Sequence, residues 1–140
     1  MAARGDTLAA VFALTDTVYL FDVRGRLLER VPIPFLGFRR PSEPMPKLAS
    51  LDEYRKWASG FSAISQVFWL ADGSFLVLYF DTDGVAPRWR LHHMSRGGRR
   101  RFEILDSPQL LAASPAGGSL YFVAPGAETP ASWTVGSLAR

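Results

Sequence analysis

Short apolar stretches separated by turn residues recur along the chain, and this pattern predicts a protein built from β-strands. Stretches such as 17–23 and 74–80 are rich in valine, tyrosine and phenylalanine, which are common in strands. Glycine turns such as Arg24-Gly25 join neighbouring stretches in the manner of antiparallel hairpins. The predicted strands cover residues 7–14, 17–23, 26–33, 62–70, 74–80, 89–94, 99–105, 110–114, 120–123 and 133–135.

One segment has helical spacing and follows a proline-rich loop over 35–47. Ser50 with Glu53 three residues later forms a capping box, and Gly60 ends the helix. The apolar residues on one face of this helix are Leu51, Tyr54, Trp57 and Ala58. We expect that face to pack over the sheets, because the helix is too short for a membrane anchor and its polar face carries both charges.

Two pairs of similar positions indicate an internal repeat. The tetrapeptide at 73–76 resembles that at 118–121, an offset of 45 residues, and Trp89 matches Trp133 at an offset of 44. Propeller blades recur at about 40–50 residues with four strands each. We therefore predict an all-β fold of antiparallel β-propeller-type blades with one short inserted helix, and a β-sandwich is the alternative. The expected units are a partial blade over 1–34, an insertion over 35–60, a complete blade over 61–105 and a partial blade over 106–140.

Three stretches resemble bacterial six-bladed β-propeller proteins. They read VYLFDVRGRLLERVPIP over 18–34, LADGSFLVLYF over 70–80 and WRLHHMSRG over 89–97. The last stretch has one extra residue and carries His93 where aspartate is usual in the family. The resemblance covers nearly the whole chain, but its motifs form hairpins and not a site. It implies the C-terminal portion of a propeller, about two and a half to three blades, in a family whose members are commonly extracytoplasmic.

Composition limits the chemistry that the chain can perform. It has 140 residues, 48% of them hydrophobic, which suits one globular domain. The absence of cysteine excludes disulfides, thiolate metal sites and a cysteine nucleophile. No P-loop, dinucleotide fingerprint, G-x-S-x-G or H-E-x-x-H motif is present. We therefore predict no catalytic or cofactor-binding residues, and we favour a non-enzymatic binding or protein-interaction scaffold.

An arginine-rich string stands out in a chain whose net charge is only +3. The residues that would contact a phosphate group or a nucleic acid are Arg96, Arg99, Arg100 and Arg101. The string lies at a glycine hairpin, where charge also protects an exposed strand from edge-to-edge pairing. We favour that second interpretation, and a nucleic-acid binder stays as an alternative function.

Two further candidates concern metals. Asp81 and Asp83 begin like a calcium loop, although the twelfth position is His92 instead of the glutamate that an EF-hand requires. A Ca²⁺ site on these aspartates would belong to a calcium-dependent lactonase-like or hydrolase propeller, the alternative enzyme function. His92 and His93 are adjacent in a predicted strand, so they should point to opposite faces and not share one ion.

The expected partners follow from the unfinished ring. Blades bury their core by stacking, so the end blades of an arc keep exposed apolar faces. We expect self-association or a protein partner, and no membrane span. The short apolar run at 8–14 lacks a clean cleavage site and is better explained as a strand than as a signal peptide, so the compartment stays open.

Overall fold

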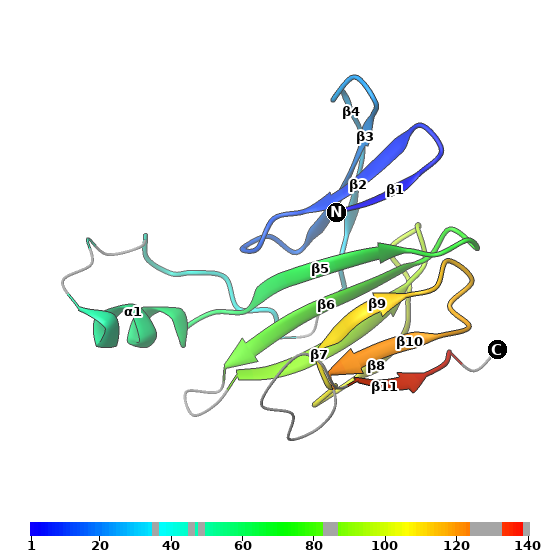
Figure 1. Cartoon of the computed structure of the whole chain (residues 1–140). Helices are drawn as coiled ribbons and strands as arrows, with labels where there is room; N and C mark the ends of the chain where they lie inside the picture. The colour runs from blue at the N-terminus through cyan, green and yellow to red at the C-terminus, as the bar shows by residue number, and fades with distance from the viewer. Residues whose placement is uncertain (35–36, 45–46, 48–49, 83–86, 124–132, 139–140) are drawn as a thin grey trace.

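A computed structural model of the chain describes residues 1–34, 37–44, 47, 50–82, 87–123 and 133–138. In this part of the chain the protein is all-β, with three antiparallel sheets and one short helix (Figure 1). Within each sheet the strands follow chain order, so every neighbouring pair is also adjacent in sequence. The predicted all-β class is confirmed.

The N-terminal and central sheets have four strands each, and the C-terminal sheet has three. The N-terminal sheet contains β1 (Ala2–Arg4), β2 (Thr7–Val11), β3 (Thr17–Asp22) and β4 (Leu27–Pro32). The central sheet contains β5 (Ala63–Trp69), β6 (Phe75–Thr82), β7 (Pro87–Met94) and β8 (Arg100–Ile104). The C-terminal sheet contains β9 (Leu110–Ala113), β10 (Leu120–Val123) and β11 (Trp133–Gly136). The sequence pattern missed β1, whose Ala-Ala-Arg sequence has no β-branched or aromatic residue.

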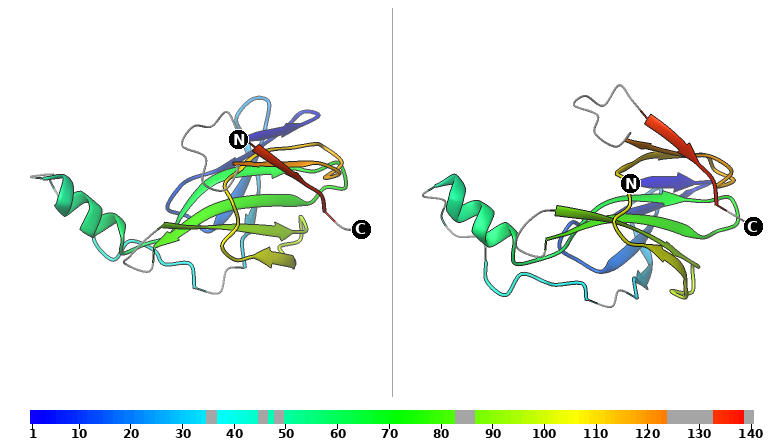
Figure 2. Two further views of the ribbon diagram at one scale, coloured as in Figure 1. Left: turned by 60° about the horizontal axis from the view of Figure 1, so that its bottom comes forward. Right: turned by 90° about the horizontal axis from the view of Figure 1, so that it is seen from below.

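The central sheet is covered on both faces. One hydrophobic cluster joins it to the N-terminal sheet, and a second cluster joins it to the C-terminal sheet. In β6, five consecutive residues, 75–79, are at most 2% exposed. Phe75, Val77 and Tyr79 belong to the first cluster, whereas the alternating Leu76 and Leu78 belong to the second. Strands buried on both faces have continuous apolar runs of this kind, and the other two sheets lie on opposite sides of the central one (Figure 2).

The sequence repeat has a structural counterpart in the first hairpins of the central and C-terminal sheets. The repeat aligns Gly73 with Gly118, but in the structure Gly73 and Gly117 occupy the same turn position, with φ of 85° and 68°, which glycine adopts without strain. Each glycine donates its backbone N–H to the carbonyl three residues earlier, at 3.0 Å and 2.8 Å. The two matched tryptophans also agree, because Trp89 lies in the third strand of the central sheet and Trp133 begins the third strand of the C-terminal sheet.

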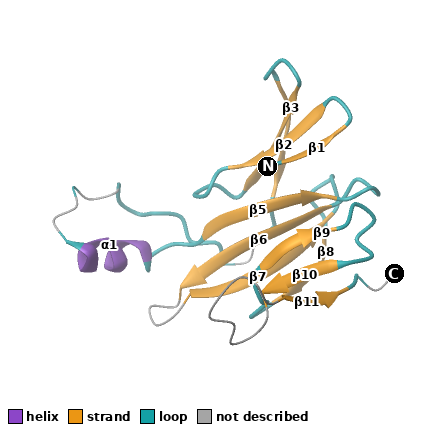
Figure 3. Cartoon of the chain, viewed as in Figure 1, coloured by secondary structure: helices purple, strands orange, loops and turns teal. Residues whose placement is uncertain are grey.

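The helix α1 (Leu51–Ala58) has the bounds and the cap that the sequence predicts. Ser50 Oγ accepts a hydrogen bond from the backbone N–H of Glu53 at 3.2 Å. The helix forms part of an arm, whose described residues are 40–44, 47 and 50–61, that projects from the sheets (Figure 3).

The expectation that α1 packs over the sheets is wrong. None of its residues is buried, and Leu51 is 61% exposed. The apolar contacts of the helix stay within the arm and at its end, where the Trp57 ring meets the Phe61 ring at 4.6 Å. Trp57 Nε1 also donates to the backbone carbonyl of Glu43 at 3.2 Å. A second ring contact of Trp57, with Tyr54 at 6.0 Å, lies within the helix itself.

Candidate functional site

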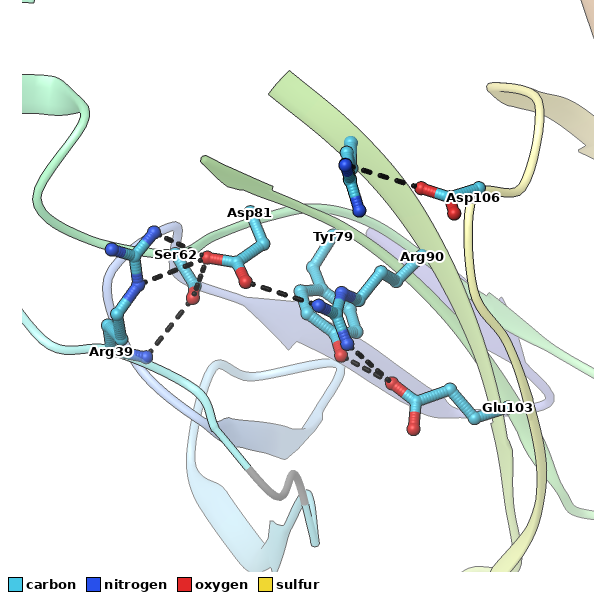
Figure 4. A network of polar contacts seen from close by, with 8 residues as sticks. Arg39, Ser62, Tyr79, Asp81, Arg90, Glu103 and Asp106 are labelled. Atoms are coloured by element: carbon cyan, nitrogen blue, oxygen red, sulfur yellow. Dashed lines mark hydrogen bonds and ion pairs between the residues drawn. The ribbon is translucent and has the colours of Figure 1, made fainter. Parts of the chain in front are cut away.

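A network of polar side chains surrounds Asp81 at the end of β6 (Figure 4). Arg39 donates to Asp81 Oδ1 through Nη2 at 2.8 Å and through Nε at 3.2 Å. The buried hydroxyl of Ser62 donates to the same oxygen at 3.0 Å. Arg90 on β7 approaches the second oxygen, Oδ2, at 3.4 Å. Both oxygens of this carboxylate are therefore engaged by guanidinium groups.

The network continues to β8 through Arg90. Its Nη1 lies 3.9 Å from Glu103 Oε1, and the Tyr79 hydroxyl donates to that oxygen at 2.6 Å. Burial raises the pKa of Tyr79 well above its ordinary value near 10, and the bond to Glu103 raises it further. Two arginines and two carboxylates make the group neutral overall, which suits a partly buried position where an unpaired charge is costly.

The network places one of the two predicted calcium ligands and leaves the other unplaced. Asp81 is held by two arginines, so a cation at this carboxylate would have to displace both of them. Asp83 lies outside the described residues. Among the residues that the structure describes, no group of three histidine, aspartate or glutamate side chains is arranged to hold a metal ion. The calcium site stays a prediction.

The two histidines lie on opposite faces of the central sheet, as expected. His92 pairs with Val77, which faces the N-terminal sheet, and His93 pairs with Leu76, which faces the C-terminal sheet. Both histidines are buried, and His93 stacks edge-on against Phe102 at 4.9 Å. Their opposite directions argue against one shared ion.

A serine, a histidine and an aspartate do meet in the β5–β6 turn. The Ser74 hydroxyl donates to Asp72 Oδ1 at 2.5 Å and lies 2.8 Å from His93 Nε2. In a hydrolytic triad the histidine stands between the other two, so that it can take the proton from the serine. Here the serine stands in the middle and is only 1% exposed. This cluster orders the turn and does not offer a nucleophile to a substrate.

The arginine-rich hairpin joins β7 to β8. Arg96 is committed to an ion pair with Glu29 on β4, with Nη2 to Oε2 at 2.9 Å. Arg99 is exposed, and its backbone N–H donates to Ser95 Oγ at 3.2 Å. The side chains of Arg100 and Arg101 lie outside the described part of the chain. One of the four predicted anion contacts is thus occupied by a link between two sheets, and the nucleic-acid function stays a prediction.

A cavity of about 330 Å³ lies where the first strands of the three sheets approach one another. We call it the inner-edge pocket. Its lining comes from β1, from β5 and from the end of β9 with the turn that follows: Met1, Ala2, Gln66, Val67, Phe68, Trp69, Leu70, Ala113 and Pro115. Sequence reasoning missed this site because its residues are ordinary strand residues from three distant parts of the chain.

Comparisons with family models, with curated proteins and with solved structures find no match to this chain. The likeness to six-bladed propellers therefore rests on the hairpin motifs alone. In the described residues there is also no helix with the length and hydrophobicity that crossing a membrane requires.

Proposed function

We propose that the chain is a non-enzymatic binding scaffold of the β-propeller type, which completes itself by association with a second copy. Three features support the propeller arrangement: meander sheets in chain order, a central sheet covered on both faces, and repeated first hairpins. Contacts between β1, β2 and β5 also bring the inner strands of two sheets together, as at a propeller axis.

The main support for the proposed association is the outer face of the N-terminal sheet, which exposes aromatic side chains. Phe12 packs against Tyr19 at 5.1 Å between ring centroids, and Tyr19 stacks with Phe21 at 6.5 Å. This aromatic row stays partly or largely exposed, and Phe12 reaches 54%. The C-terminal sheet exposes Tyr121 and Val135 in the same way. In the central sheet, faces of such composition are covered by a neighbouring sheet.

A second copy offers sheets of the same kind for both uncovered faces. If the aromatic row of one copy covers the Tyr121 face of the other, a two-fold axis repeats the contact and closes the assembly. Three sheets from each copy then form a ring of six blades.

Sedimentation velocity of the full chain between about 5 and 200 µM tests this association. We expect a dimer that dissociates on dilution, since interfaces of this class give micromolar affinities or better. Tyr19→Thr and Tyr121→Thr should each shift the equilibrium toward monomer by at least about tenfold, because each removes apolar contact area. The matched control Leu51→Thr removes an exposed apolar residue from the arm and should leave the equilibrium unchanged.

Mixing the two threonine variants sharpens the test. A mixed dimer has one intact contact and one contact with both substitutions, whereas each pure dimer has two impaired contacts. The mixture should therefore dimerise differently from the average of the two variants, which a nonspecific association would not do. A wild-type chain that stays monomeric at every concentration would overturn the proposal.

A further inference from the structure

The inner-edge pocket is bordered by an unpaired strand edge. The backbone N–H of Leu70 donates to the carbonyl of Ser74 across the turn at 2.9 Å, so the backbone polar groups of Leu70 point toward the β6 side. Backbone groups in an antiparallel pair alternate in direction along the strand. Following the register back from the turn, the N–H and C=O groups of Trp69 and Val67 point away from β6. Because β5 is the edge strand of its sheet, these groups face the pocket.

Neighbouring sheets bind this edge at its two ends and leave its middle free. At one end the Ile64 N–H donates to the carbonyl of Ala13 at 2.8 Å. At the other end the Ala71 N–H donates to the carbonyl of Pro115 at 2.6 Å. Within the described residues, no strand pairs with β5 on this side between these two bonds. The gap leaves about two residues of strand edge to be satisfied from outside.

Two residues of the pocket lining, on opposite faces of β5, each carry a buried polar atom without a partner among the described residues. Gln66 pairs with Leu78, on the face toward the C-terminal sheet, and Trp69 pairs with Phe75, on the face toward the N-terminal sheet. Gln66 Oε1 and Trp69 Nε1 are buried and have no hydrogen-bond partner in the described part of the chain. Buried polar atoms without partners are rare in folded proteins, and each points to water, an ion or a ligand. One of these atoms accepts and the other donates.

None of the side chains that line the pocket is charged. The nearby Arg4 guanidinium lies 6.0 Å from the Trp69 ring and is engaged by the Ala71 carbonyl at 2.7 Å, so a charged ligand would find no counter-charge in the lining itself.

We propose that the inner-edge pocket binds a short, uncharged, extended peptide segment, which adds to the free edge of β5 as a further strand. The peptide backbone would pair with Val67 and Trp69, whose groups repeat at the two-residue period of an extended chain. The large side chains of Phe68, Trp69 and Leu70 in the lining limit the space and favour peptides with small side chains. This inference rests on the proposed binding function and gives it a ligand class, but it does not require the dimer.

The test is an NMR titration of the full-length chain with N-acetyl-trialanine amide, an uncharged peptide. We expect saturable shifts of the backbone amide signals of Val67 and Trp69 and of the Trp69 indole N–H signal. The same peptide methylated on its central backbone nitrogen loses one strand hydrogen bond and should bind about tenfold more weakly.

Two variants separate the side-chain contributions. Trp69→Phe keeps an aromatic ring but removes the indole donor, and Gln66→Met removes the amide at similar length. Each variant should weaken the affinity for the peptide about three- to tenfold, as expected for the loss of one net hydrogen bond. The control Trp57→Phe, in the arm, should leave the affinity unchanged.

Absence of shifts at Val67 and Trp69, or equal binding of the methylated peptide, would overturn the inference. The methylated peptide decides the question with the wild-type chain, even if a variant fails to fold. A monomeric protein that binds the peptide would remove the proposed association and keep this site, whereas a dimer that ignores the peptide would do the reverse.

Discussion

Strands β3 and β6 have similar sequences and different surroundings. Both are nearly continuous apolar runs, VYLF over 18–21 and FLVLYF over 75–80. In β6 every residue from 75 to 79 is buried, whereas in β3 buried Val18 and Leu20 alternate with partly exposed Tyr19 and Phe21. A run without polar alternation is typical of a strand that is covered on both faces. The sequence of β3 therefore suits a covered outer face, and the described residues of this chain leave Tyr19 and Phe21 partly exposed there.

The comparison shows that the hydrophobic pattern of a strand reflects whether one or both of its faces are covered, including by a neighbouring sheet. A soluble strand with one wet face normally alternates apolar and polar residues. The departure from that rule in β3 supports the proposed association through the outer face of the N-terminal sheet.

The largest effect should come from the doubly covered strand. Leu78→Ala opens a cavity in the cluster between the central and C-terminal sheets, and we expect a loss of about 2–5 kcal/mol in the free energy of unfolding. Phe21→Thr on the outer face of β3 should cost about 1 kcal/mol or less in the monomer. Urea denaturation at low protein concentration measures both. Equal losses would contradict the contrast between the two strands.

A middle-sized effect should come from Tyr79, the residue of β6 that links its apolar run to the polar network. Tyr79→Phe removes the hydrogen bond to Glu103, a bond to a charged group worth about 1.5–3 kcal/mol. The raised pKa of Tyr79 in the folded chain also has a pH signature. Its stabilisation is complete below the unfolded pKa near 10 and is lost as the pH rises above that value.

The free energy of unfolding of the wild type should therefore fall more steeply above pH 10 than that of Tyr79→Phe. Denaturation curves at pH 8, 10 and 11 give this comparison, and other tyrosines and lysines cancel because both proteins contain them. A difference between the two proteins that is the same at all three pH values would show that the tyrosine proton does not contribute.

The smallest effect concerns the turns that follow β3 and β7. Asp22 accepts the backbone N–H of Arg26 at 2.8 Å, and Ser95 accepts that of Arg99 at 3.2 Å in the equivalent turn. The bond from Arg26 lowers the pKa of Asp22. The carboxylate therefore stabilises the fold above its ordinary pKa near 3.8, and this stabilisation is lost as the pH falls below that value.

Asp22→Ser gives the turn after β3 the residue type that Ser95 provides in the equivalent turn after β7. We expect a small decrease in Tm at pH 7 that disappears near pH 2, measured by circular dichroism on thermal unfolding. A decrease that persists at low pH would assign the effect to lost packing and not to charge.

The sequence predicted what depends on local spacing. Ser50 and Glu53 fix the start of α1 through one cap, and Gly73 and Gly117 fix two turns through their backbone freedom. The first two strands of the central sheet, β5 and β6, follow from their apolar runs. Because adjacent strand residues point to opposite faces of a sheet, the sequence also predicted that His92 and His93 lie on different faces.

The remainder depends on contacts between distant segments. Ser74 meets His93 only because β6 and β7 adopt one particular register, which no spacing in the sequence specifies. The partners of Asp81 come from the arm base and from β7, so the aspartate motif alone suggested a cation. The inner-edge pocket needs segments from three sheets to approach one another, which is a property of the whole fold.

The base of the arm has a practical consequence. Arg39 and Ser62 are joined by reciprocal contacts, Arg39 N–H to Ser62 Oγ at 3.1 Å and Ser62 N–H to the Arg39 carbonyl at 2.8 Å. The chain therefore leaves the sheets and returns to them at a single clamped point. Closing a longer loop costs little extra entropy. We therefore expect the arm beyond this clamp to accept an inserted sequence such as an epitope or a fluorescent domain. The arm is in this sense a natural grafting site, whose content can change while the three sheets keep their arrangement.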